Sequence, residues 1–99
     1  MFARFEWDPM KAAANLRKHG ISFDEAAAIF ADPNAVFDQD REVDGEERWQ
    51  VIGCLDDTLM LTVAHTVRDE DDTEIYRIIS ARQADRRERR RYERENGQV

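Results

Sequence analysis

Apolar and polar residues alternate along three consecutive segments of this chain, which is the pattern of β-strands with two different faces. The segments cover about residues 48–55, 59–65 and 75–82. Asp56-Asp57 and the acidic run 68–72 separate them as short turns. Because strands joined by short turns pair side by side in opposite directions, these segments predict an antiparallel meander. A shorter alternation at residues 5–7 predicts one more strand near the N-terminus.

A helical pattern follows that first strand. Asp8 is a good N-cap, Pro9 suits the first helical position, and Gly20 is placed to end the helix after Lys18-His19. Ala13 and Leu16 are expected on its inner face, with Ala12 as a further candidate.

Further signals predict a second and a third helix. Ser22 and Glu25 form a capping-box pattern, and Asp32-Pro33 ends the second helix. Residues 38–47, which are mostly acidic, predict a solvated loop. The final helix, about residues 83–95, is arginine-rich and has little to bury. The expected order is therefore β-α-α-β-β-β-α, an α+β fold in one domain, residues 1–99.

Charge is distributed unevenly along the 99 residues, whose formal net charge is −7. The segment 77–94 contains eight arginines and three acidic residues, so it carries +5 and leaves −12 for the remainder. An acidic chain is not a generic nucleic-acid binder, so any contact with a polyanion must use this local basic segment.

Composition and motifs exclude several other classes. A single cysteine, the lack of a membrane-length apolar run and the lack of a signal-peptide core indicate a soluble, cytoplasmic protein. There is no phosphate-binding glycine loop, CxxC or HExxH motif, and residues 40–51 lack the glutamate that a calcium loop needs. We therefore expect neither a metal site nor a cofactor.

The segment Ile75–Arg82 is the most informative part of the chain. A strand that only packs would use apolar residues where this one has Arg77, Ser80 and Arg82. Strict alternation places Arg77 with Ile79 on one face, and Ser80 and Arg82 on the other. Two interpretations remain open: ion pairs with carboxylates of the same domain, or anion binding.

Cleavage of RNA by transesterification needs a base, an acid and cations around phosphorus, and His, Glu, Lys and Arg can fill these roles without a metal. For several of these residues, a structural role without catalysis is an alternative explanation. His65 on an apolar strand face fits a buried structural histidine, and Lys18-His19 fits a helix C-terminus. Glu88 and Tyr92, four residues apart, fit a simple helical side-chain contact.

An ordered set of short motifs resembles the BrnT family. The most specific are Lys18-His19-Gly20-Ile21-Ser22-Phe23 and Arg77-Ile78-Ile79-Ser80-Ala81-Arg82, and further matches are Phe5-Glu6-Trp7-Asp8, Lys11, Asn15, Ala26, Phe30, Asp32-Pro33, Glu47-Arg48, Gly53, Glu88 and Tyr92. The resemblance implies a RelE-like fold and a ribonuclease toxin of a type II toxin–antitoxin pair. It also implies neutralisation by a BrnA-type antitoxin, with any DNA contact made through the antitoxin alone.

The resemblance also suggests a candidate site. The first group is Lys18, His19, Glu47, Arg48, Arg77, Ser80 and Arg82; the second is Glu88, Tyr92 and, outside the matching motifs, His65. Arg86, Arg90 and Arg91 are expected to contact RNA or the partner. In these roles Arg77 and Arg82 would hold the scissile phosphate, and Glu47 or a histidine would move protons. The alternative is a non-catalytic module whose arginine-rich end docks a partner protein.

Overall fold

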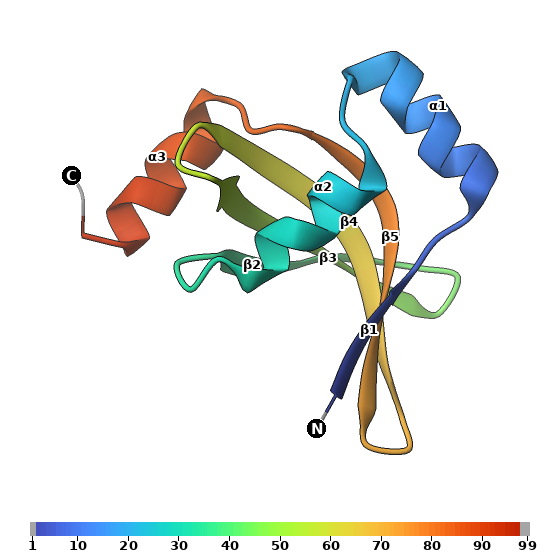
Figure 1. Ribbon diagram of the computed structural model, residues 1–99. Helices are drawn as coiled ribbons and strands as arrows, with labels where there is room; N and C mark the ends of the chain where they lie inside the picture. Colours follow the sequence, from blue (N-terminus) through green and yellow to red (C-terminus); the bar gives the residue numbers. More distant parts are fainter. Residues whose placement is uncertain (1, 98–99) are drawn as a thin grey trace.

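The computed structural model describes residues 2–97, which form one curved sheet with helices on both of its sides (Figure 1). The elements, in chain order, are β1 (Phe2–Glu6), α1 (Pro9–His19), α2 (Phe23–Ala28), the 3-10 turn η1 (Ile29–Ala31), β2 (Val36–Val43), β3 (Glu46–Leu55), β4 (Leu59–Glu70), β5 (Thr73–Gln83) and α3 (Arg86–Glu95). The α+β class expected from the sequence is confirmed.

The sheet has the strand order β1-β5-β4-β3-β2. β1 lies parallel to β5, whereas each of the other neighbouring pairs is antiparallel, so the sheet is mixed. The predicted meander of the last three strands is present as β3, β4 and β5.

The prediction of a solvated loop over residues 38–47 is wrong, and with it the expectation of four strands. Val36–Val43 forms β2, which pairs with β3 through a tight turn at Asp44-Gly45. β2 is an edge strand, so most of its charged side chains remain in solvent while its backbone is hydrogen-bonded. An acidic sequence is therefore compatible with a strand at this position.

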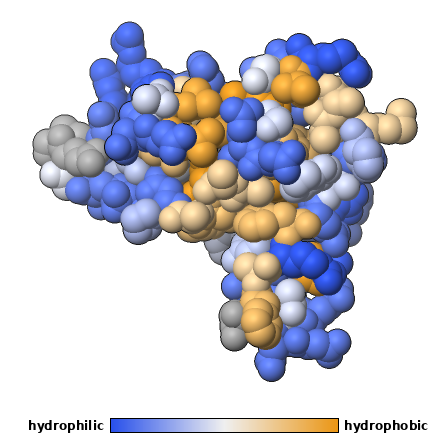
Figure 2. All heavy atoms as spheres, viewed as in Figure 1, coloured by the Kyte–Doolittle hydropathy of each residue, from blue (hydrophilic) through white to orange (hydrophobic). Residues whose placement is uncertain are grey.

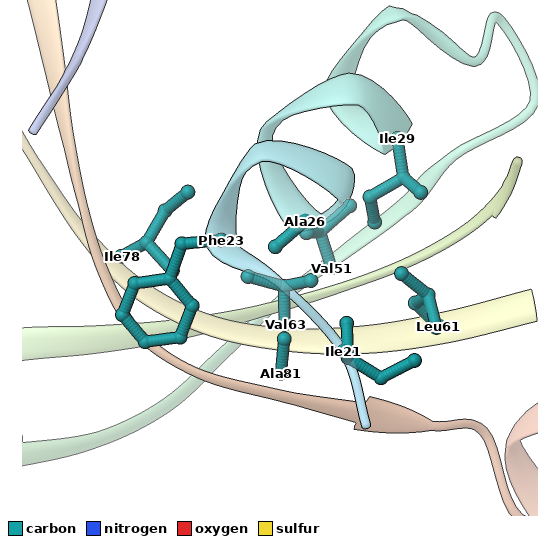
Figure 3. Packing of buried hydrophobic residues seen from close by; sticks show 9 residues of the cluster. All are labelled: Ile21, Phe23, Ala26, Ile29, Val51, Leu61, Val63, Ile78 and Ala81. Carbon is teal, nitrogen blue, oxygen red and sulfur yellow. The ribbon is translucent and has the colours of Figure 1, made fainter. Parts of the chain in front are cut away.

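The main core lies between the sheet and the segment formed by α2 and η1 (Figure 3), and Ala12 of α1 packs against it. Val51, Leu61 and Val63 project from neighbouring strands into Phe23 and Ile29. Gly53 permits the closest approach, because a Cβ atom there would lie 3.0 Å from the carbonyl oxygen of Ile29. We call this side of the sheet the helix-covered face.

The capping signals of the first two helices are confirmed. Asp8 accepts a hydrogen bond from the N–H of Met10, Gly20 has φ +72°, and Ser22 and Glu25 form a reciprocal capping box. The inner face of α1 differs from the expectation, because Leu16 is 50% exposed and Asn15 is buried.

Asn15 attaches α1 to β5 at a place where the edge of β5 that faces away from β4 has no neighbouring strand. Its amide donates to the carbonyls of Ala81 and Ile21, at 2.8 and 3.0 Å, and its oxygen accepts from the N–H of Ala81 at 3.1 Å. The side chain thus replaces a neighbouring strand at Ala81, since β1 pairs with β5 only as far as Arg77.

The opposite side of the sheet carries α3, which begins at Arg86 because β5 continues to Gln83. A small cluster that includes Ile52, Ala84 and Tyr92 packs beneath the helix. The Tyr92 hydroxyl donates to Asp32 at 2.7 Å and Arg91 pairs with Asp38. Polar contacts therefore contribute much of the attachment of α3. In the part of the chain described, no helix is both long and apolar enough to cross a membrane.

Candidate functional site

A β-bulge in β5 decides which of its side chains share a face. Arg77 pairs with Thr66, Ser80 with Ala64 and Arg82 with Thr62, while Ile79 is the extra residue opposite β4. Because Thr62, Ala64 and Thr66 alternate along β4, their three partners also lie on one side of the sheet. The sequence-based expectation that Arg77 faces away from Ser80 and Arg82 is wrong, since it assumed unbroken alternation.

Arg48 joins this surface from β3. It shares its side of β3 with Gln50, which pairs with Ala64, so β3 and β5 place basic side chains on either side of the small residues of β4. Arg77 and Ser80 are exposed, whereas Arg48 and Arg82 are half-buried. We call this surface the arginine face; its residues are Arg48, Thr62, Ala64, Thr66, Arg77, Ser80 and Arg82.

Glu88 holds the guanidinium of Arg82. Nη1 and Nη2 of Arg82 donate to the two carboxylate oxygens at 2.8 and 2.9 Å, and Glu88 also accepts from the N–H of Asp85 at 2.8 Å. Burial raises the pKa of Glu88, but the hydrogen bonds from Arg82 and Asp85 outweigh it and hold the pKa below its usual value. The carboxylate is therefore an ionised clamp that joins α3 to β5.

Arg77 has no comparable clamp. Its neighbour on β1 is Glu6, whose carboxylate oxygens accept from Nη1 and Nη2 of Arg68, each at 3.1 Å. Within residues 2–97, no hydrogen bond or ion pair is made by the side chain of Arg77. Its guanidinium is therefore available to a ligand.

A hollow of about 480 Å³ adjoins the arginine face between α3 and strands β2 and β3. Its lining includes Arg87, Arg90, Arg91 and Arg94 from the helix, with Asp38 opposite them. Two of the three arginines expected to contact RNA or a partner, Arg90 and Arg91, thus line this hollow, while Arg86 is exposed near the start of α3.

Two buried polar side-chain atoms of the arginine face differ in their surroundings. Oγ1 of Thr62 faces Glu88, where it helps to lower the pKa of that carboxyl, whereas Nε of Arg48 has no hydrogen-bond partner among the described residues. Arg48 does have a long contact of 3.8 Å from Nη2 to Glu46. A buried donor without a partner costs free energy, so Nε of Arg48 is a group that an anionic ligand on this face would satisfy.

The remaining candidate residues lie elsewhere. Glu47 pairs with Glu42 and projects from the helix-covered face, on the opposite side of β3 from Arg48. His65 is 1% exposed among the rings of Phe30, Phe37 and Tyr76. Burial lowers its pKa, which favours the neutral form. Both placements separate these two residues from the arginine face.

Three further candidates are placed by helices. Lys18 and His19 are exposed at the C-terminal end of α1, and no hydrogen bond or ion pair in residues 2–97 links them to the arginine face. Tyr92 is directed at Asp32, where burial and this contact raise its pKa. The site therefore unites Arg48, Arg77, Ser80, Arg82 and Glu88.

The sequence did not single out Thr62, Thr66, Asp38 or Asn15 as parts of the site. The two threonines look like ordinary strand residues, and Asp38 was assigned to a loop. Asn15 had two signals, since it belongs to the motifs that resemble the BrnT family and it interrupts an apolar helical face, but neither showed its contact with β5. In the described residues, no group of three or more His, Cys, Asp or Glu side chains could hold a metal ion.

The fold and this surface define a class: a small α+β domain with two helices on one face of a mixed sheet and arginines on the other. Residues 7–88 match the family of the ribonuclease toxin BrnT of type II toxin–antitoxin systems. The chain therefore belongs to the BrnT family.

A solved structure agrees with this assignment. The chain is similar to the crystal structure of the Brucella abortus ribonuclease toxin BrnT, with a TM-score of 0.64 and 22% sequence identity, over 85% of this chain and 99% of that chain. At this identity the likeness establishes the fold. Among curated proteins, none matches the chain.

Proposed function

We propose that this chain is a metal-independent endoribonuclease toxin with a RelE-like fold, which cleaves cytoplasmic RNA on the arginine face and is neutralised by a BrnA-type antitoxin. The family supplies the class, a ribonuclease toxin with an antitoxin partner. The observation that carries the location is the β5 bulge, which gathers Arg77, Ser80 and Arg82 beside Arg48.

The arginine face has the chemistry that phosphate binding requires. Arg77 is free to bind a phosphate, and Arg82 is held at a fixed position by Glu88. Guanidinium groups bind phosphate oxygens with two parallel hydrogen bonds and stabilise the charge that develops in the transition state. The small side chains of Ala64 and Ser80 leave room for a phosphate between the arginines.

The candidate proton-transfer residues are not gathered on the arginine face of the described chain. Both carboxylate oxygens of Glu88 are occupied by Arg82, so Glu88 acts as a positioning residue. Glu47 lies on the other face and His65 is enclosed. His19 ends α1, a helix of the helix-covered face, and no hydrogen bond or ion pair in residues 2–97 links it to the arginine face, so these candidates leave the general acid and base unassigned.

The decisive experiment compares the parent with an Arg77→Ala/Arg82→Ala variant on total RNA in EDTA. The matched control is Arg17→Ala/Arg89→Ala, which removes the same charge at exposed helical positions. We expect cleavage by the parent and the control, and none by the arginine-face variant, with equal folding by circular dichroism. Cleavage by all three would refute the location, and loss of the parent's cleavage in EDTA alone would refute metal independence.

A second candidate function is a non-catalytic module that docks a partner through the same arginines. It is favoured by the hollow between α3 and strands β2 and β3, because a concave surface lined by several arginines suits an acidic segment of a partner protein. Under this alternative, induced expression is harmless and partner binding depends on Arg82 and Arg91. Growth arrest by the parent, relieved in the Arg77→Ala/Arg82→Ala variant, would exclude it.

A further inference from the structure

The helix-covered face is not covered along its whole length. The chain leaves α2 and η1 at Ala31, while the strands extend towards the turns at Asp44-Gly45 and Asp71-Asp72. Four aromatic side chains of this face remain at least partly accessible there: Phe5, Phe37, Trp49 and Tyr76. We call this surface the aromatic half-face.

A hollow of about 260 Å³ lies at its centre, between η1 and β1. Phe5, Phe30, Phe37 and Tyr76 line it, and Phe37 is 46% exposed. Figure 2 shows that apolar side chains gather over α2 and continue towards β1, with hydrophilic residues around them. Accessible aromatic side chains around a hollow are typical of surfaces that accept an anchoring side chain of another protein.

The rim of the aromatic half-face is uniformly acidic. The pairs Glu42 with Glu47 and Asp69 with Glu74 place four carboxylates on the same side of the sheet as the aromatic residues. The neighbouring basic residues, including Arg41 and Arg68, lie on the opposite side, because successive side chains of a strand point to opposite faces. No lysine or arginine occupies a strand position on the aromatic half-face of the described chain.

This charge pattern identifies the occupant. Carboxylates repel RNA and acidic lipid surfaces, and two copies of the chain could not stack these half-faces without opposing their carboxylates. A basic protein segment with an exposed apolar side chain satisfies both the rim and the hollow. β1 adds a free strand edge beside the hollow, because it pairs with β5 alone.

We propose that the aromatic half-face binds a basic segment of the antitoxin, which places an apolar side chain in the hollow between η1 and β1. This inference rests on the antitoxin partner in the proposed function, but it does not depend on catalysis. It assigns the two surfaces of one sheet to different ligands, with RNA on the arginine face and the antitoxin on the aromatic half-face.

The test uses charge reversals at matched positions on the two faces. Glu42→Lys/Asp69→Lys changes the aromatic half-face, and Glu46→Lys/Glu70→Lys makes the same change on the opposite side of the same strand ends. The probe is the purified product of the reading frame next to the toxin gene, titrated against each full-length variant by calorimetry. All four positions are exposed, so folding should be retained.

We expect Glu42→Lys/Asp69→Lys to weaken antitoxin binding at least about tenfold at low salt, with a smaller effect at high salt. The matched control should bind within about twofold of the parent. Phe37→Ser should weaken binding at every salt concentration, since it removes apolar contact rather than charge.

Equal binding by the parent and both half-face variants would overturn the proposal, as would a loss confined to the opposite-face control or no binding of the probe to the parent. RNA cleavage by the parent is measured in parallel. Antitoxin binding that depends on the half-face, in a parent that does not cleave RNA, would uphold this inference and refute only the catalytic part of the proposed function.

Discussion

Asn15 provides the most direct test of how the site is positioned. The substitution Asn15→Ala removes three hydrogen bonds, two to the carbonyls of Ala81 and Ile21 and one from the N–H of Ala81. All three backbone groups belong to buried residues, because Ala81 is 0% and Ile21 is 4% exposed. None of these groups would have its present partner in the variant.

The expected cost follows from those three bonds. At about 1 kcal/mol for each net hydrogen bond, their loss costs about 3 kcal/mol. Alanine has a higher helix propensity than asparagine, which offsets roughly 0.5 kcal/mol of this loss. A net loss of about 2.5 kcal/mol in the free energy of unfolding corresponds to a fall of roughly 10–20 °C in Tm for a domain of this size.

Urea unfolding followed by circular dichroism measures this loss, with Lys11→Ala as the control at an exposed position of the same helix. A change below about 0.5 kcal/mol in Asn15→Ala would show that water replaces the side chain, and would refute the reasoning. RNA cleavage should also fall at temperatures where the variant is folded, because Ser80 and Arg82 flank Ala81.

Four further predictions concern other contacts. Glu88→Gln should lower kcat more than it raises KM for RNA, because it releases Arg82. In the parent, the stability measured by urea unfolding should decrease as the pH falls below about 4.5, because the pKa of Glu88 is lower in the folded state than in the unfolded chain. Tyr92→Phe should cost about 1–2 kcal/mol in urea unfolding by removing the hydrogen bond to Asp32, and an unchanged midpoint would contradict this role. The lowered pKa of His65 predicts that stability falls as pH drops below about 6.5, where the unfolded chain binds a proton first, and His65→Phe should flatten that pH profile. Binding of a 2′-deoxy-substituted RNA should weaken as the salt concentration rises, with a slope of about −2 in log K against log salt for phosphate contacts by the three arginines of the arginine face. Binding that does not depend on salt would exclude these phosphate contacts.

Local signals in the sequence predicted the helices and three of the strands well. Capping residues such as Asp8, Ser22 and Gly20 act within one turn, so their effect is readable without knowing the rest of the fold. Local signals did not predict β2, because its stability comes from pairing with β3 and its acidic side chains are tolerated only at a sheet edge. That context is not visible in residues 36–43 alone.

The candidate site shows the same limit. The residues Arg77, Ser80 and Arg82 were identified from their unusual chemistry in a strand, but their common face depends on a bulge that the sequence does not mark. Glu47 and Arg48 are adjacent in the chain and yet project from opposite faces. Motif membership therefore named candidate residues but did not group them in space.

Under the proposed function, the two faces of the sheet also account for RNA binding by an acidic protein. A net charge of −7 would repel RNA if the charge were spread evenly over the surface. Alternation instead places Arg48, Arg77 and Arg82 on one side and the carboxylates of Glu42 and Asp69 on the other. The electrostatic potential at a bound phosphate is set mainly by the nearest charges, because salt at moderate concentration screens charges that lie more than about 8–10 Å away. In the two proposals made above, the acidic excess would recruit a basic segment of the antitoxin while the arginine face attracts RNA.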